Sequence, residues 1–244
     1  MSKSVRVGYD LLAWEKYGKR LPIAVPIQEN PHWLICGSSG SGKSYFVLWL
    51  LRNLLREEID NLVLYFCDFK NSDDFSFLRG YEHYYTGEDC ARGLDEFYAE
   101  YQGVKSGETK DGKLRLVLFD EWAGFQVWMT QTDKKRAERY KSIMLEVLLM
   151  GRSMRCGCFV VMQRNDAAYI QGRENFFVTC VFGKLSPDMR KMLIPGEDID
   201  QRPTYAPGEG LIRTDQFGVK FLKVPRLKSV QAVHDEIFAF LTRG

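Results

Sequence analysis

The residues that carry the clearest chemistry lie between positions 37 and 44, which read Gly-Ser-Ser-Gly-Ser-Gly-Lys-Ser. This spacing, G-x-x-x-x-G-K-[ST], is the phosphate-binding P-loop, whose glycines let successive backbone N–H groups point at phosphate oxygens. Lys43 would add a positive charge for the β- and γ-phosphates, and Ser44 would offer a hydroxyl to Mg²⁺. The pattern therefore predicts a site for ATP and Mg²⁺. The residues expected to bind the nucleotide are Gly37, Ser38, Ser39, Gly40, Ser41, Gly42, Lys43, Ser44 and Tyr45.

The segments on either side of this loop fit the same chemistry. Trp33–Cys36 is a short apolar run, and Tyr45–Arg56 continues with a helical pattern. A strand, a glycine-rich loop and a helix in this order aim the positive end of the helix dipole at the phosphates. The competing interpretation is a Gly/Ser turn that only joins a strand to a helix.

A second apolar run, Leu114–Phe119, ends in two adjacent acids and has the form of a Walker B strand. Asp120 is expected to hold Mg²⁺, directly or through a water of its shell, and Glu121 to orient and polarise the attacking water. The alternative is a pair of acids that only favours the start of the following helix, where negative charge is stabilising.

Two more residues are candidates for catalysis. Gln163 follows the apolar run Cys158–Met162, and the carboxyl ends of central parallel strands line one crevice, so Gln163 could sense the γ-phosphate or the water. Arg152 stands 11 residues earlier, at the end of a predicted helix. It could stabilise phosphoryl transfer in a neighbouring subunit, as an arginine supplied in trans does. Arg155 competes for that role.

Composition sets broad limits. The chain has 244 residues, 45% hydrophobic and 27% charged, with a net charge of +2, so overall charge does not call for a nucleic-acid partner. The six cysteines are expected to be small core residues in a reducing compartment, and three dispersed histidines argue against a metal site built from histidine. No signal peptide is visible, and no apolar stretch is long enough to cross a bilayer.

The pattern of strands and helices predicts an α/β fold with a mostly parallel, doubly wound central sheet flanked by helices. Nearly continuous apolar runs indicate strands covered on both faces. The expected strands are 62–67, 114–119, 158–162 and 176–182, after short strands at 5–8 and 21–25. The expected helices are 87–102, 134–154 and 229–241. The predicted divisions are an extended N-terminal segment, 1–30, a motor domain, 31–228, and a C-terminal helix, 229–244.

Taken together and in order, these motifs resemble the FtsK/HerA superfamily of ring-forming DNA motors, especially FtsK/SpoIIIE-like proteins of conjugative elements. The segments that carry the resemblance are Pro31–Ser44, Cys67–Lys70, Phe119–Glu121, Gly151–Arg152 with Gln163–Arg164, Gly172–Phe176 with Gly183–Pro187, and Pro207–Gly210. The resemblance implies a RecA-like P-loop NTPase that works as a hexameric, ATP-driven DNA translocase in conjugation or mobile-element processing. It also implies that Arg152 is the trans finger and that Lys70 lies near a subunit boundary.

The sequence departs from that family in ways that leave the cargo open. Phe69 replaces a proline, and neither a membrane-spanning N-terminus nor an appended winged-helix domain is visible. The candidate DNA-contacting stretches are 134–141 and 164–173. The expected location is the cytoplasm, with a membrane-bound or relaxosome-type protein as a candidate recruiting partner. The alternatives are a related motor that moves or recruits protein, and a P-loop nucleotide switch or small-molecule kinase.

Overall fold

The continuous apolar runs form the centre of a ten-stranded sheet with the order β2-β1-β10-β9-β8-β3-β7-β6-β4-β5. The structure is a computed structural model, and it describes residues 3–58, 61–163, 169–184, 193–194 and 205–243. The strands are β1 (Ser4–Asp10), β2 (Pro22–Pro26), β3 (His32–Gly37), β4 (Leu62–Asp68), β5 (Tyr84–Thr86), β6 (Leu114–Asp120), β7 (Cys156–Met162), β8 (Val178–Phe182), β9 (Glu209–Thr214) and β10 (Gly218–Lys223).

The sheet has a parallel part and an antiparallel part. Strands β5, β4, β6, β7, β3 and β8 are parallel, as the apolar runs predicted. Strands β9, β10, β1 and β2 extend the sheet from β8 as antiparallel neighbours. The predicted α/β fold with a mostly parallel central sheet is confirmed, and the predicted N-terminal strands belong to the same sheet.

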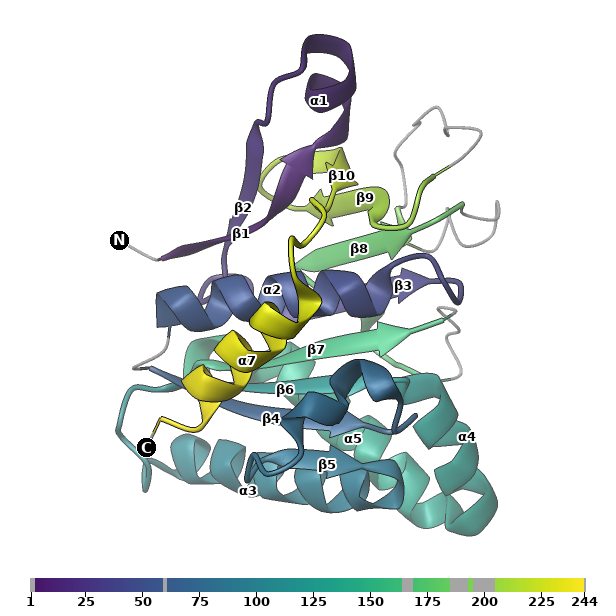
Figure 1. The fold of residues 1–244 in the computed structure, drawn as a ribbon. Helices are drawn as coiled ribbons and strands as arrows, with labels where there is room; N and C mark the ends of the chain where they lie inside the picture. The colour runs from purple at the N-terminus through teal and green to yellow at the C-terminus, as the bar shows by residue number, and fades with distance from the viewer. Residues whose placement is uncertain (1–2, 59–60, 164–168, 185–192, 195–204, 244) are drawn as a thin grey trace.

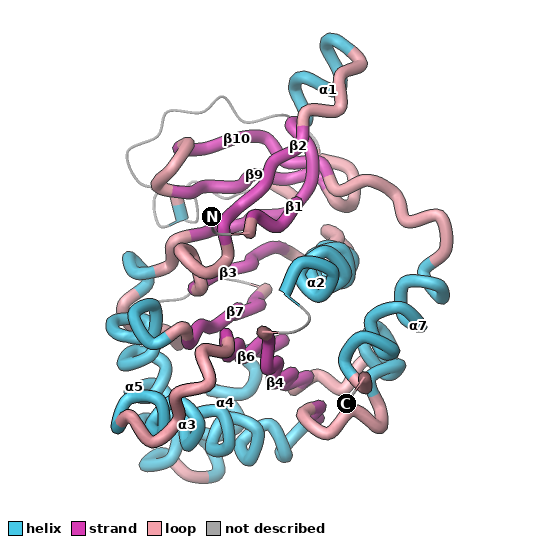
Figure 2. The backbone as a smooth tube through the Cα atoms, turned by 90° about the vertical axis from the view of Figure 1, so that its left-hand side faces the viewer, coloured by secondary structure: helices cyan, strands magenta, loops and turns pink. Residues whose placement is uncertain are grey.

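Helices cover both faces of the sheet. The helices of the described residues are α1 (Leu11–Tyr17), α2 (Lys43–Glu58), α3 (Cys90–Ser106), α4 (Trp122–Thr132), α5 (Lys134–Met150) and α7 (Val230–Leu241), with short 3₁₀ turns η1 (Asp73–Leu78), η2 (Gly87–Asp89), η3 (Gly151–Met154) and η4 (Arg173–Asn175). Figures 1 and 2 show α2 and α7 on one face and α3, α4 and α5 on the other. Each face encloses its own apolar cluster. The central strands are therefore buried on both sides, which explains their continuous apolar sequence.

The helix boundaries refine the sequence prediction. The predicted helix at 134–154 ends at Met150, and Asp133 caps its start by accepting a hydrogen bond from the Arg136 N–H. The predicted helix at 87–102 begins at Cys90 and continues to Ser106. The apolar insert after Glu121 is α4, a helix that the periodicity did not reveal. The C-terminal prediction matches α7, which packs against α2.

The cysteines and the lengths of the helices can be compared with the sequence predictions. All six cysteines are buried and unpaired, which agrees with their predicted role as small core residues. Within the described ranges, no helix combines the length and apolarity that a bilayer crossing requires.

Candidate active site

The P-loop connects β3 to α2 at the carboxyl edge of the parallel strands, between β8 and β7. Gly40 and Gly42 adopt φ values of 75° and 98°, which favour glycine. The Phe46 N–H donates to the Gly42 carbonyl at 2.9 Å and so closes the first turn of α2. The loop therefore delivers the N-terminus of a 16-residue helix to the edge of the sheet, as the sequence predicted.

A second turn holds the P-loop in place. The Gly208 N–H donates to the Ser41 carbonyl at 3.0 Å, and the Val224 N–H donates to the Gly208 carbonyl at 2.9 Å. A Cβ built on Gly42 would lie 2.4 Å from the Gly208 nitrogen. The late Pro207–Gly210 turn, noted in the sequence only as a resemblance, is thus a direct support of the phosphate loop.

We expect Gly42→Ala to weaken nucleotide binding by at least about 10-fold, because the new methyl group collides with the backbone at Gly208 and the left-handed φ adds strain of about 1–3 kcal/mol. Gly112→Ala is the matched control, since Gly112 also has a positive φ, 68°, but no atom lies within 4 Å of its added Cβ. Titration with a fluorescent ATP analogue measures the effect. Equal affinities for the two variants would contradict the role of the close contact.

Lys43 points back along its own loop. Its Nζ donates to the carbonyl oxygens of Gly37, at 2.5 Å, and Ser38, at 2.9 Å. Burial lowers the pKa of Lys43, while the nearby Glu121 and Asp120 carboxylates act in the opposite direction. The ammonium is therefore already surrounded by oxygen atoms in a position where phosphate oxygens can replace them.

Three acids gather at the ends of the neighbouring strands β4 and β6. Asp68 and Asp120 are directly opposed in the register of these strands, and both are buried. Burial and, to a smaller extent, the Asp68 and Glu121 charges raise the pKa of Asp120 to about 7, although Lys43 and Lys70 act in the opposite direction. Burial also raises the pKa of Asp68, although Tyr84 Oη and the Asn71 N–H both donate to it. Neighbouring carboxylates of this kind are stabilised by protonation or by positive charge beside them.

Asp120→Asn is expected to stabilise the nucleotide-free protein more at pH 8 than at pH 5. The Asp120 pKa rises on folding from 3.8 to about 7, so its contribution to stability is fully present below pH 3.8 and is lost as the pH rises through 7. Relative to the variant, wild type should lose about 2–3 kcal/mol of unfolding free energy between pH 5 and pH 8. Urea unfolding at both pH values tests this. A difference that does not change with pH would contradict the raised pKa.

Glu121 has a strained backbone and a fixed side chain. It has φ 62° and ψ 49°, the left-handed region that a residue with a side chain rarely occupies. Gln163 Nε2 donates to Glu121 Oε2 at 3.0 Å. The structure therefore brings together the two residues that the sequence predicted at the ends of β6 and β7, and strain of this kind is typical of functional positions.

Two cavities meet at the P-loop. The first has a volume of about 260 Å³ and is lined by Ser39, Gly40, Gly42, Lys43, Ser44, Tyr45, Lys70, Ser72, Asp74, Asp120, Glu121 and Gln163. The second has a volume of about 430 Å³ and is lined by Gly42, Tyr45, Ala206, Pro207, Gly208, Glu209, Lys223, Val224 and Arg226. Gly42 and Tyr45 line both, so a polar cavity for phosphates continues into a larger one beyond Tyr45.

The donor set fits Mg²⁺ bound together with phosphates. Ser44 and Asp120 both line the smaller cavity, and within the described residues no group of three or more His, Cys, Asp or Glu side chains could hold a metal alone. Mg²⁺ in nucleotide sites characteristically takes one or two protein oxygens together with phosphate oxygens and water. Ser44 and Asp120, the residues predicted from the sequence, are therefore the ones that would hold it.

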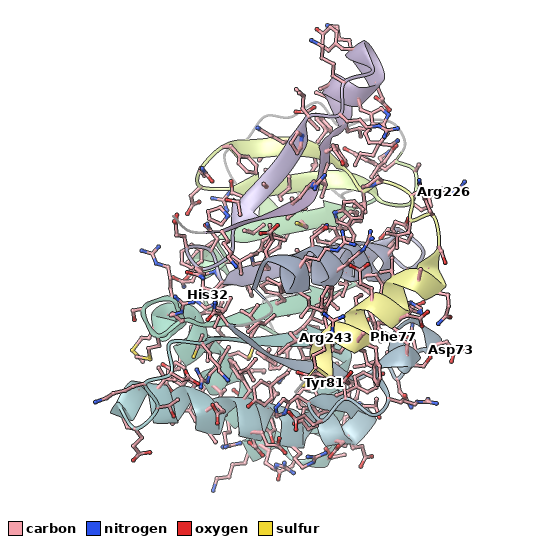
Figure 3. All side chains as sticks on the ribbon, turned by 60° about the vertical axis from the view of Figure 1, so that its left-hand side comes forward. His32, Asp73, Phe77, Tyr81, Arg226 and Arg243 are labelled. Carbon is pink, nitrogen blue, oxygen red and sulfur yellow. The ribbon has the colours of Figure 1, made fainter. Side chains whose placement is uncertain are left out.

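Arg152 lies at the amino ends of the parallel strands, opposite to the carboxyl ends where the P-loop is. It sits in η3 before β7, next to His32, the first residue of β3. Burial of the His32 ring, together with the charge of Arg152, lowers the pKa of His32 to about 3. Its guanidinium packs on the Phe177 ring, 5.3 Å from the centroid. The six residues of β3 span about 16 Å between His32 and the P-loop. Figure 3 likewise shows His32 on the side away from Arg226 and Asp73. Because Arg152 acts on His32, it lies away from the nucleotide site of its own chain.

The structure adds residues that the sequence did not assign to the site. Asp68 and Lys70, which were noticed only as part of a family segment, adjoin Asp120, and Lys70 lines the phosphate cavity of its own chain. Arg226 and Lys223 line the larger cavity. The signal for Asp68 was its place at the end of an apolar run, as for Asp120. No comparable pattern marks the two cations.

The comparisons agree with this geometry. Residues 11–94 match the FtsK/SpoIIIE family. The chain has the P-loop ATPase fold of the FtsK/SpoIIIE type. The resemblance drawn from the motifs is thereby confirmed. No curated protein sequence matches the chain.

Solved structures of FtsK/SpoIIIE-type proteins cover nearly the whole chain at low sequence identity. EssC (ATPases 2 and 3) from Geobacillus thermodenitrificans has a TM-score of 0.72 and 16% identity over 97% of this chain and 48% of its own. The pCW3 conjugation coupling protein TcpA, in a monomer form with ATPγS, has a TM-score of 0.71 and 18% identity over 98% of this chain and 70% of its own. The Thermomonospora curvata type VII secretion ATPase EccC has a TM-score of 0.69 and 16% identity over 98% of this chain and 31% of its own. This chain therefore spans about half of the EssC structure and a third of the EccC structure.

Proposed function

We propose that this chain is an ATP-hydrolysing motor that moves DNA, in conjugative transfer or in the processing of a mobile element. The observation that carries the proposal is the placement of Lys43, Asp120 and Glu121 around one polar cavity at the carboxyl edge of the sheet. A second cavity of about 430 Å³ adjoins it and has room for a nucleoside. Phosphate, metal and base can thus be bound side by side.

The chain's own residues suggest how hydrolysis would proceed. Backbone N–H groups of the P-loop and the Lys43 ammonium hold the phosphates and neutralise charge that develops on them. Ser44 and Asp120 would hold Mg²⁺, which would supply further neutralisation of the phosphate charge. Glu121 orients and polarises the attacking water, and Gln163, hydrogen-bonded to Glu121, senses whether the γ-phosphate is present.

The position of Arg152 supports a ring, in which one subunit completes the site of the next. We propose a hexamer when active, because a head-to-tail interface closes into a ring and brings the far edge of one copy to the nucleotide edge of another. Arg155 is the weaker candidate for the finger, since its guanidinium donates to Gln28 of its own chain at 3.3 Å.

Arg152→Ala is expected to lower ATP turnover about 10³-fold and to leave ATP affinity unchanged, as loss of a trans finger does. Mixing Arg152→Ala subunits with Lys43→Ala subunits should restore part of the activity, because an interface where the first supplies the P-loop and the second supplies the arginine is intact. Arg155→Ala is the comparison variant. A mixture as inactive as its components would contradict action in trans.

The proposal also names the molecule that the motor moves. DNA is favoured because the similarity extends to a conjugation coupling protein and because the ordered motifs resemble DNA translocases. Protein cargo is the second candidate, since the chain is equally similar in fold to the secretion ATPases EssC and EccC, and one EccC structure contains a signal sequence peptide. A membrane-bound or relaxosome-type protein could recruit the motor to the cytoplasmic face of a membrane.

Steady-state ATPase rates with single- and double-stranded DNA, at low and moderate salt, test the proposal. A DNA motor should be stimulated strongly at low salt and lose that stimulation steeply as salt rises, because phosphate contacts release counterions. A flat response, with stimulation by a secretion-type peptide instead, would favour protein cargo. Phosphate transfer to a metabolite by a monomer would establish a kinase and remove both motor functions.

A further inference from the structure

The β1–β2 connection carries a protrusion, residues 11–21, that stands out from the end of the sheet (Figures 1 and 2). It consists of α1 and the turn that follows it. Asp10 caps the start of α1, where its side chain accepts a hydrogen bond from the Ala13 N–H, and Gly18 ends it with a φ of 63°. The protrusion is therefore a defined structure with specific caps at both ends.

Its surface combines cations with large apolar side chains. Lys16, Lys19 and Arg20 are exposed, and in the described part of the chain none of them forms an ion pair. The apolar side chains that are exposed on it are Leu12 (49%), Tyr17 (63%) and Leu21 (50%). Lys16 Nζ lies 5.4 Å from the centre of the Tyr17 ring, so charge and ring face solvent together. Solvent-exposed apolar residues gathered in this way mark a contact surface.

The other basic stretch of the chain is different. In α5, Arg139 pairs with Asp95 at 2.6 Å and Lys141 pairs with Glu138 at 3.0 Å. Arg136 donates to Tyr140 Oη at 2.9 Å. Most of the cations that the sequence offered there as a DNA contact are thus already engaged within the chain. The second sequence candidate, 164–173, lies partly outside the described residues.

The protrusion also adjoins the nucleotide site. The Trp14 ring lies under both Arg20, at 4.8 Å, and Lys223, at 5.5 Å. Lys223 pairs with Glu209 at 2.7 Å, and Glu209 in turn accepts a hydrogen bond from the Ala206 N–H. Lys223, Glu209 and Ala206 line the larger cavity beside the P-loop. The protrusion is therefore connected through Trp14 to the wall of the larger cavity beside the P-loop.

We propose that residues 11–21 are a nucleic-acid contact, with Lys16, Lys19 and Arg20 on backbone phosphates and the Tyr17 ring against a base. This inference rests on the proposed DNA motor and names the surface that the DNA touches. Unpaired cations beside an exposed aromatic ring are the combination with which proteins bind single strands. Lysine, two of the three cations, is depleted at protein–protein interfaces, which makes a protein partner the weaker fit.

The test compares two triple variants in binding of fluorescein-labelled oligothymidylate and of a duplex, between 50 and 200 mM salt. Lys16→Gln, Lys19→Gln, Arg20→Gln should lower affinity at the lowest salt by at least about 10-fold. It should also reduce the slope of log affinity against log salt by about 2. The matched control is Lys110→Gln, Lys134→Gln, Lys135→Gln, which removes three exposed lysines elsewhere and should bind like wild type. Both should keep the wild-type melting temperature and the basal ATPase rate, because none of the six residues lines the nucleotide cavities.

A second variant separates stacking from charge. Tyr17→Leu keeps the charge and the apolar bulk, so it should weaken oligothymidylate binding about 5-fold or more and leave the salt slope unchanged. Wild-type affinity and slope in the first triple variant would overturn the proposal, as would loss of binding in the control triple, which would assign the contact to α5. A change only in oligomeric state or in binding to anionic vesicles would overturn it in favour of a second copy or a membrane. If wild type binds neither form of DNA, the proposed motor function fails together with this surface.

Discussion

Lys43→Ala is expected to reduce ATP turnover by about 10³-fold or more and to abolish tight ATP binding. The ammonium is the positive charge that the loop places among its own carbonyl oxygens, within reach of the phosphates. A half-buried charge is less screened than one in open solvent, so its interaction with phosphate is stronger than in water. Steady-state hydrolysis and titration with a fluorescent ATP analogue measure the two effects separately.

The control for Lys43 is available in the same cavity. Lys70 lines it as well but is exposed and lies outside the P-loop. Lys70→Ala should therefore lower turnover less than Lys43→Ala does, because a charge open to solvent is screened. If Lys43→Ala kept near-normal turnover, or if Lys70→Ala were the more severe change, the phosphate-binding role would belong to Lys70.

The parallel half of the sheet could be predicted because strands that are buried on both faces have nearly continuous apolar sequences. β7 is a continuous apolar run and β6 is one apart from Arg115 and the terminal Asp120, and every residue in both strands is buried. β9 and β10 lack such a continuous apolar sequence. β10 carries only one buried residue, Leu222, and β9 contains Glu209 and Arg213 among its apolar residues. Their assignment depends on pairing between segments, which periodicity does not encode.

The short helices show the same limit. α1 has only seven residues, which is too short for a helical pattern of apolar residues to be recognised. Its capping residues, Asp10 and Gly18, nevertheless stand at the correct positions in the sequence. α4 is apolar on most of its surface because Trp122 and Phe125 pack against Phe119, while Trp128 packs on Phe69. A helix that is buried on more than one side loses the amphipathic pattern by which helices are recognised.

In the candidate site, the local motifs could be predicted from the sequence, but the contacts between distant segments could not. The P-loop and the acids after β6 follow from residue type and spacing. The opposition of Asp68 and Asp120 requires knowing that β4 and β6 are neighbours, although β5 and α3 separate them along the chain. The support of Ser41 by Gly208 joins segments more than 160 residues apart. Strand order, rather than any pattern of residues, determines which side chains meet.

Glu121→Gln is expected to lower hydrolysis by about 10²–10³-fold while ATP binding stays as tight as in wild type. The amide has the shape of the carboxylate, and its oxygen can still accept the hydrogen bond from Gln163 Nε2. It lacks the negative charge and the basicity that polarise water, so the loss falls on the chemical step, where general base catalysis contributes about this much. Single-turnover hydrolysis and equilibrium binding of ATP distinguish the two effects.

The partner in this contact provides the matched control. Gln163→Ala removes the hydrogen bond to Glu121 but leaves the carboxylate in place, and Glu121 keeps its left-handed backbone because that conformation begins α4. We therefore expect Gln163→Ala to retain more activity than Glu121→Gln, and the double variant to resemble Glu121→Gln, since Gln163 then has no catalytic carboxylate to position. A wild-type rate of hydrolysis in Glu121→Gln would mean that another residue is the general base. Additive losses in the double variant would mean that Gln163 acts on the γ-phosphate independently of Glu121.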